Sequence, residues 1–249
     1  LCRSPRSSLF ARPVRMTAAP VPWSCCCSRA QRRLSPGPDG VPVIHPRLTL
    51  ALAIMEALAI FAYAISGFIE ARTRRLDAVG TFLVGIATAF GGGTLRDVLL
   101  ERRPFYWVEH QGYLIAIFVM SLFAPTLLKM TSRLLSERVL LVADAVGLGL
   151  FSVAGTSIAH DAQMPWFTSV MMGVLTGVFG GVIRDVLCNE MPLILRDSRP
   201  YATCAFVGCW LYVLLDYLNV DTVYSVLGAT AFILLARLVT FRFNVRLPH

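Results

Sequence analysis

The chain has 249 residues, of which 56% are hydrophobic and only 15% are charged, and its mean hydropathy is +0.64. About a quarter of the residues in a soluble domain are charged, so this composition excludes an ordinary soluble domain and indicates a polytopic membrane protein. The net charge of +8 does not indicate nucleic-acid binding, because the arginines cluster between apolar stretches and no recognition motif accompanies them.

The first 47 residues differ in composition from the rest. Residues 1–47 are rich in Arg, Pro and Ser, and they contain no apolar run that could serve as the core of a signal peptide. An Arg-rich leader is compatible with a transit peptide. The favoured interpretation is a non-native extension upstream of the true start, with Met16 or Met55 as possible starts. We expect this stretch to be disordered and without function.

Seven apolar stretches of membrane length follow, separated by short polar breaks. They are residues 48–69, 78–100, 113–128, 139–159, 167–187, 201–218 and 222–239. The third and sixth are short, and a six-span alternative would omit the third or the last. The pattern predicts an all-α polytopic membrane protein with seven transmembrane helices.

Basic residues gather in alternate loops, which predicts how the spans are oriented. Eleven follow the odd-numbered spans or lie at the C-terminal end, namely Arg72, Arg74, Arg75, Lys129, Arg133, Arg138, Arg196, Arg199, Arg237, Arg242 and Arg246. Three lie on the opposite face, namely Arg47, Arg102 and Arg103. Because basic loops stay inside, the C-terminus is predicted to be cytoplasmic and the N-terminus outside.

A repeat with an offset of 88 residues runs through the spans. The stretch FGGGTLRDVL in span two returns as FGGVIRDVL in span five. Residues 56–113 and 144–201 are identical at 13 of 58 positions, and six of these identities fall within residues 92–99. Shared apolar bias would scatter the identities, so their concentration indicates duplication of a unit.

Each unit contains three spans, and an odd number forces the second copy to enter the membrane from the opposite side. The predicted organisation is therefore a first three-helix repeat over residues 48–130 and an inverted second repeat over residues 131–220. Residues 221–249 would form the seventh helix and a cytoplasmic tail. Inverted repeats of this kind point to a transport site near the midplane of the membrane.

The glycines of the repeated motif predict breaks in spans two and five. They are Gly91, Gly92 and Gly93 in the first copy and Gly180 and Gly181 in the second. Glycine in a helix interior costs about 1 kcal/mol relative to alanine, and freed backbone groups are tolerated in a membrane only beside a polar cavity or within protein. The alternative interpretation is close helix packing, which small residues permit.

Charged residues follow the glycines in both copies. Adjacent Arg and Asp side chains point about 100° apart on a helix, so we expect each arginine to pair with the aspartate of the other copy. The expected pairs are Arg96 with Asp185 and Arg184 with Asp97. The alternative is a charge cluster that fixes the helix ends at the membrane surface.

Further polar residues lie inside the spans at equivalent positions of the two copies. Glu56 and Asp144 lie in spans one and four, where an acidic residue indicates an ion pathway unless it simply lies at a helix end. Thr88 and Thr176 lie one turn before the glycines. Their hydroxyls could line the same cavity or bond back to their own helix.

No pattern in the sequence indicates an enzyme, a metal site or a cofactor. The histidines are scattered, at His45, His110, His160 and His249, with no catalytic order or ligand spacing. Cys25, Cys26 and Cys27 are adjacent, and Cys188, Cys204 and Cys209 fall in apolar stretches, so neither set resembles a zinc site.

The duplicated GGGTLRD and GGVIRDV motifs, the arrangement of spans and the length resemble the bacterial trimeric intracellular cation channel family. The same proteins are described as a glycine-transporter domain, formerly an uncharacterised membrane family. The resemblance covers about residues 50–240. It implies a homotrimer in the bacterial inner membrane, in which each subunit has its own pore for monovalent cations such as potassium.

The resemblance also implies that kinked second and fifth helices line the pore. The kink glycines would be Gly91 to Gly93 and Gly180 to Gly181. The second copy has Phe179 where the first has Gly91, so a weaker second kink is expected.

Two functional classes stay open on the sequence. A passive channel needs a continuous polar path, and Glu56 and Asp144 would suit a cation. A secondary transporter of glycine or another small amino acid needs a closed site, and Arg96 and Arg184 would suit its carboxylate. A membrane scaffold would leave the symmetric motifs unexplained. The preferred prediction is the passive cation channel.

Overall fold

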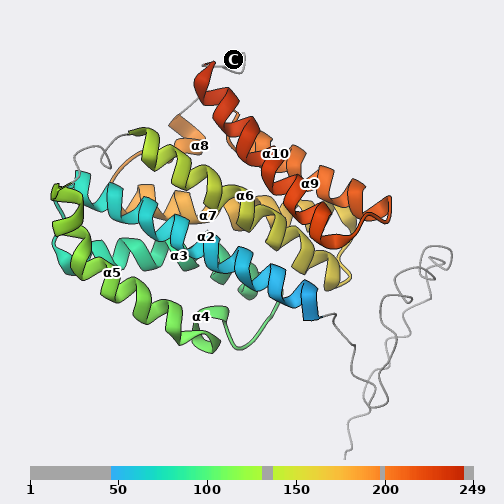
Figure 1. Cartoon of the computed structure of the whole chain (residues 1–249), viewed down its shortest axis with the longest axis horizontal. Helices are drawn as coiled ribbons and strands as arrows, with labels where there is room; N and C mark the ends of the chain where they lie inside the picture. The colour runs from blue at the N-terminus through green and yellow to red at the C-terminus, as the bar shows by residue number, and fades with distance from the viewer. Residues whose placement is uncertain (1–45, 131–136, 197–199, 244–249) are drawn as a thin grey trace, which may run out of the picture. The chain divides into compact units, whose positions relative to one another are not determined.

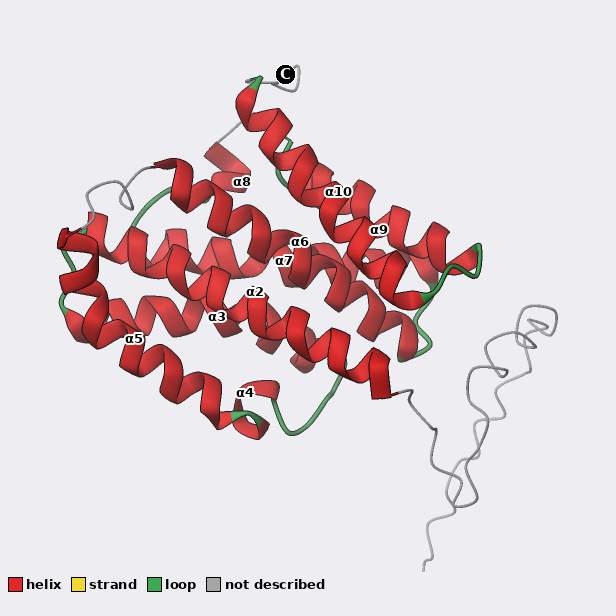
Figure 2. Ribbon diagram, in the orientation of Figure 1, coloured by secondary structure: helices red, strands yellow, loops and turns green. Residues whose placement is uncertain are grey.

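The computed structural model describes residues 46–130, 137–196 and 200–243, and all regular secondary structure in these ranges is helical (Figures 1 and 2). The prediction of an all-α protein is confirmed. The helices are α2 (Pro46–Thr73), α3 (Ala78–Leu99), α4 (Tyr106–Glu109), α5 (Gln111–Met130), α6 (Glu137–Asp161), α7 (Trp166–Leu187), α8 (Leu193–Arg196), α9 (Ala202–Tyr217) and α10 (Thr222–Arg242).

Each of the seven apolar stretches contains a helix whose ends lie within a few residues of the predicted ones. Among the described residues, five helices are long and apolar enough to cross a membrane, namely Ala53–Thr73, Ala78–Leu99, Arg138–Asp161, Trp166–Leu187 and Thr222–Arg242. Two shorter apolar helices are Gln111–Ala124 and Ala202–Tyr217. Crossing by all seven stays a prediction.

Most of residues 1–47 lie outside the described residues, but Pro46 and Arg47 begin α2, so the helix starts slightly before the predicted boundary. Proline is well tolerated at this position, because the first amides of a helix have no partner within the helix. The other highlighted residues outside the described ranges are Met16, Cys25, Cys26, Cys27, His45, Arg133, Arg199, Arg246 and His249.

Short, capped turns join the long helices and set their packing. Asp77 caps α3, where its carboxylate accepts a hydrogen bond from the amide of Gly80 at 2.7 Å. Asp221 caps α10 in the same way through the amide of Val223 at 3.0 Å. These side chains satisfy amides that the first turn of a helix leaves unpaired.

Four helices form the centre of the fold. Helices α2, α3, α6 and α7 pack against one another, with α5 on one side and α9 and α10 on the other (Figure 1). Ile60, Tyr63, Leu148 and Val153 are among the largest fully buried side chains in this core.

Large apolar side chains cover the outside of the peripheral helices. On α5 and α10 they include Ile115, Phe118, Leu122, Phe123, Leu227, Phe232, Leu235 and Val239, all exposed. A soluble monomer rarely exposes so many large apolar side chains on its outer helices. The surface therefore fits a protein that is surrounded by lipid.

Helices α3 and α7 continue through their glycines without interruption, so the predicted breaks are wrong. Residues 91–93 lie inside α3, and residues 180–181 lie inside α7. The intrinsic cost of glycine in a helix is only about 1 kcal/mol, and tertiary packing readily exceeds it.

The two halves of the chain have the same order of elements. Two long helices, one short helix and a third apolar helix follow one another as α2–α3–α4–α5 and again as α6–α7–α8–α9, with α10 last. The short helices α4 and α8 were not predicted. The opposite orientation of the two halves in a membrane and the predicted domain boundaries stay predictions.

Candidate functional site

The backbones of α3 and α7 meet at two glycines. A Cβ atom built on Gly92 would lie 2.0 Å from the carbonyl oxygen of Thr176, and one built on Gly180 would lie 2.7 Å from that of Thr88. Side chains do not approach a backbone atom this closely. Because the 88-residue offset relates the two contacts, the same close crossing is made twice. Close packing, the alternative interpretation, accounts for Gly92 and Gly180.

The threonines at this crossing bond back to their own helices. The Thr88 hydroxyl donates to the carbonyl of Val84 at 2.6 Å, and the Thr176 hydroxyl donates to the carbonyl of Met172 at 2.6 Å. Both side chains are buried. Of the two interpretations of these hydroxyls, the structure shows the second, the bond within the helix.

The remaining glycines have different surroundings. A Cβ on Gly91 would meet only the flexible end of Ile183, at 2.5 Å. A Cβ on Gly181 would lie 3.0 Å from the Tyr201 hydroxyl and 3.1 Å from Asp144 Oδ1, whereas one on Gly93 would have no neighbour within 4 Å. Among these three positions, only Gly93 faces open space.

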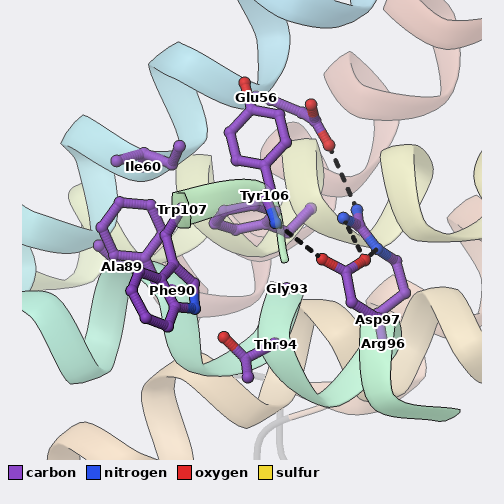
Figure 3. Close-up of a pocket in the computed structure, with 11 residues that line it drawn as sticks. Glu56, Ile60, Ala89, Phe90, Gly93, Thr94, Arg96, Asp97, Tyr106 and Trp107 are labelled. Atoms are coloured by element: carbon purple, nitrogen blue, oxygen red, sulfur yellow. Dashed lines mark hydrogen bonds and ion pairs between the residues drawn. The ribbon is translucent and has the colours of Figure 1, made fainter. Parts of the chain in front are cut away.

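The first charge cluster consists of Glu56, Arg96 and Asp97. Arg96 Nε donates to Asp97 Oδ1 at 2.9 Å, and Arg96 Nη1 donates to Glu56 Oε1 at 3.2 Å (Figure 3). The other oxygen of Asp97 accepts from the amide of Tyr106, at the start of α4, at 3.3 Å. The Arg96 side chain is only 2% exposed.

The second charge cluster consists of Asp144, Arg184 and Asp185. Arg184 Nε donates to Asp185 Oδ1 at 2.9 Å, and Arg184 Nη1 donates to Asp144 Oδ1 at 2.8 Å and also to the Ser66 hydroxyl. The second oxygen of Asp185 accepts from the amide of Leu193, at the start of α8, at 2.8 Å. The two clusters therefore share one hydrogen-bonding pattern.

The predicted pairing between copies, Arg96 with Asp185 and Arg184 with Asp97, is wrong. Each arginine binds the aspartate next to it in sequence through its Nε and Nη2 atoms. The same guanidinium then reaches an acidic residue of the preceding helix in its own half. The alternative, a charge cluster that fixes the helix ends at the membrane surface, stays a prediction. Arg96 and Arg184 do lie in the last turn of α3 and α7, and they and both neighbouring aspartates are buried within the protein.

Each cluster contains two carboxylates and one guanidinium, so its formal charge is −1. Buried charges are tolerated when they are paired and hydrogen-bonded, and here every carboxylate pairs with an arginine, although Asp144 Oδ2 has no hydrogen-bond partner among the described residues. The excess carboxylate in each cluster favours a nearby cation.

A small cavity adjoins the first cluster. Its volume of about 10 Å³ leaves room for about one water molecule. Its lining comes from α2, α3, α4 and α6 and comprises Glu56, Ile60, Ala89, Phe90, Gly93, Thr94, Arg96, Asp97, Tyr106, Trp107 and Phe151 (Figure 3). Burial and the Glu56 carboxylate raise the pKa of the Tyr106 phenol, which therefore stays neutral at physiological pH.

Several residues around the clusters were not singled out from the sequence. Tyr106 and Trp107 come from the unpredicted helix α4, and Ser66 gave no signal of its own. Tyr63 donates a hydrogen bond to the carbonyl of Gly177, across from α2 to α7. Tyr201 pairs with Tyr113 by the 88-residue offset, a signal that could have marked it. Within the described residues, no group of three or more His, Cys, Asp and Glu side chains could hold a metal ion.

Comparison with known proteins gives consistent matches over the membrane part. A family model described as glycine transporter matches residues 53–129 and 141–217. The UPF0126 inner membrane protein YadS of Escherichia coli (strain K12) is 36% identical over 197 residues, which cover 78% of this chain and 93% of that protein. The UPF0126 membrane protein YvgT of Bacillus subtilis (strain 168) is 33% identical over 204 residues, covering 80% and 96%.

Two solved structures resemble the chain in both fold and sequence. A TRIC trimeric intracellular cation channel orthologue from Rhodobacter sphaeroides has a TM-score of 0.73 and 32% identity, covering 78% of this chain and 98% of that one. A second structure, reported for the structural basis for conductance through TRIC cation channels, has a TM-score of 0.68 and 33% identity. The match covers 79% of this chain and 96% of that one.

Proposed function

The chain belongs to the trimeric intracellular cation channel family, whose family model is described as glycine transporter, and on this premise we propose that it is a membrane channel for cations. The observation that carries the proposal is the pair of buried charge clusters, each with one carboxylate more than its arginine neutralises. A fixed negative charge of this kind lowers the energy of a cation in a membrane protein.

In its finer form, the proposal is a pore for monovalent cations such as potassium within each subunit of a homotrimer. Helices α3 and α7 would line the pore, with Gly91, Gly92, Gly93, Gly180 and Gly181 as the points where they bend. Continuous helices can still bend at glycines. The name of the Rhodobacter sphaeroides relative, a trimeric cation channel orthologue, supports the trimer.

A second candidate is a secondary transporter for glycine or another small amino acid, which the description of the family model favours. Arg96 and Arg184 would have to bind the carboxylate of the amino acid. Each arginine already binds two carboxylates of the protein, which argues against this role.

Purified protein in planar bilayers under a potassium gradient should show single-channel currents, and proteoliposomes should show no saturable uptake of labelled glycine. Glu56→Gln removes the excess negative charge of the first cluster and should lower potassium conductance severalfold. Glu109→Gln changes an exposed acid of α4 and serves as the matched control, with conductance unchanged. Saturable glycine uptake without currents would overturn the channel proposal.

We also propose that the protein lies in the bacterial inner membrane with its N-terminus outside and its C-terminus in the cytoplasm. The excess of basic residues after the odd-numbered spans supports this orientation. In Escherichia coli, a green fluorescent protein fused to the C-terminus should fluoresce, and alkaline phosphatase at the same position should be inactive. Active phosphatase there would reverse the orientation.

A further inference from the structure

The two charge clusters share one pattern, and the bond from arginine Nε to the neighbouring aspartate is 2.9 Å in both, but the other two shared bonds are longer in the first cluster. The arginine–acid bond measures 3.2 Å in the first cluster and 2.8 Å in the second. The bond from aspartate to the short helix measures 3.3 Å in the first and 2.8 Å in the second. The Glu56 side chain is 12% exposed, whereas Asp144 is fully buried.

The first cluster also has more open space beside it than the second. Gly93 lines the small cavity, and a Cβ there would touch nothing within 4 Å. At the equivalent Gly181, the Tyr201 hydroxyl and the Asp144 carboxylate occupy that space, 3.0 and 3.1 Å from the Cβ position. The first cluster therefore has room to rearrange, and the second is filled.

Additional partners fix the second cluster in place. Ser66 of α2 accepts a hydrogen bond from Arg184, which ties the cluster to the other half of the chain. The guanidinium of Arg237 in α10 lies 4.4 Å from the centre of the Tyr201 ring, and such a contact is favourable.

The cover of the first cluster is the short helix α4. Tyr106 and Trp107 of α4 line the small cavity together with Glu56 of α2 and Gly93 of α3 (Figure 3). One oxygen of Asp97 binds Arg96 while the other binds the amide of Tyr106, so this carboxylate ties α4 to the ion pair.

We propose that the first cluster is the half of the cation pathway that opens, and that Asp97 is a positioning residue that holds α4 over Glu56 in the closed state. The proposal rests on the proposed channel function. Opening breaks the bond between Asp97 and the Tyr106 amide, α4 moves away, and Glu56 becomes accessible to cations. The second cluster stays assembled throughout.

The test uses a thiol at Gly93 as a reporter of access. Gly93→Cys fits the open space, and a positively charged methanethiosulfonate reagent would label it in proteoliposomes. Mass spectrometry of the labelled peptide separates this thiol from the native cysteines. The rate of labelling measures how often α4 uncovers the cavity.

Two substitutions at Tyr106 isolate the hydrogen bond. Tyr106→Ala and Tyr106→Pro both remove the phenol ring, but only proline removes the amide that donates to Asp97. Proline suits this position, because Tyr106 is the first residue of α4 and Phe105 before it is extended. Labelling should be about tenfold faster in Tyr106→Pro than in Tyr106→Ala, the factor that one hydrogen bond to a charged group contributes.

The equivalent pair in the second half is the control. Leu193→Pro and Leu193→Ala differ in the amide that donates to Asp185. The Gly93→Cys reporter should be labelled at the same rate in both variants. Asp97→Ala removes the acceptor in place of the donor. It should accelerate labelling to a similar extent. If Tyr106→Pro does not fold, this variant tests the bond between Asp97 and α4 in its place.

Equal labelling rates in Tyr106→Pro and Tyr106→Ala, or an equal acceleration by Leu193→Pro, would overturn the inference. Labelling does not depend on conduction, so the two proposals fail separately. Potassium currents with equal labelling rates would leave the channel standing and remove the role of α4. The expected labelling rates without currents in any variant would support the role of α4 and overturn the channel proposal.

Discussion

Gly92→Ala should destabilise the protein by about 1–3 kcal/mol or more, whereas Gly93→Ala, the next residue of the same helix, should leave its stability unchanged or slightly higher. The added methyl group at Gly92 would lie 2.0 Å from the carbonyl oxygen of Thr176. That oxygen belongs to the backbone of α7, so relief requires α3 and α7 to separate. At Gly93 the methyl group has no neighbour within 4 Å, and alanine favours the helix.

Thermal unfolding of the detergent-solubilised proteins, followed by the fraction that stays monodisperse after heating, measures the difference. Gly180→Ala should also lower the midpoint, because its methyl group would lie 2.7 Å from the Thr88 carbonyl oxygen. If Gly92→Ala and Gly93→Ala melt together, the backbones of α3 and α7 do not meet at Gly92. The glycine would then need another explanation.

Arg184→Gln should cost about 3–5 kcal/mol, a large fraction of the stability of a typical protein. The substitution leaves two buried carboxylates, Asp144 and Asp185, without the guanidinium that holds them. Arg96→Gln should cost less, because Glu56 is partly exposed and can recover some hydration. Thermal unfolding of the purified variants checks both expectations.

A double substitution separates the ion pair from general damage to the core. Arg184→Gln combined with Asp144→Asn removes both charges of the pair, and it should be more stable than Arg184→Gln alone. Arg102→Gln, in an exposed loop, is the control and should shift stability by no more than about 0.5 kcal/mol. If Arg184→Gln and Arg102→Gln unfold at the same temperature, the second cluster contributes little to the stability of the fold.

The positions of the helices and the equivalence of the two motifs could be predicted from the sequence, because both depend on local composition. A stretch such as residues 78–100 is apolar over the length that a bilayer requires, whatever lies beside it. The pairing of Gly92 with Gly180 and of Arg96 with Arg184 is likewise visible as repeated letters. The acidic residue, the arginine and the aspartate have the same spacing in both copies, which explains why both clusters form the same hydrogen bonds.

The helices α4 and α8 could not be predicted from local composition, because four residues show no periodicity that distinguishes a helix from a loop. Their role depends on a single acceptor each, Asp97 for α4 and Asp185 for α8. A carboxylate with two oxygens can bind an arginine and a distant amide together, and only the fold shows which amide is near.

The sequence by itself determined an all-helical chain, the positions of its apolar helices and a duplicated motif of glycines and paired charges. The tertiary structure alone decided what those glycines and charges do. Whether Gly92 breaks a helix or lets two helices touch depends on the atom opposite it, the carbonyl of Thr176 from a distant part of the chain. Which carboxylate an arginine binds depends on the path of its flexible side chain and on the helix that approaches it. Such contacts are made across space, and spacing along the chain carries no record of them.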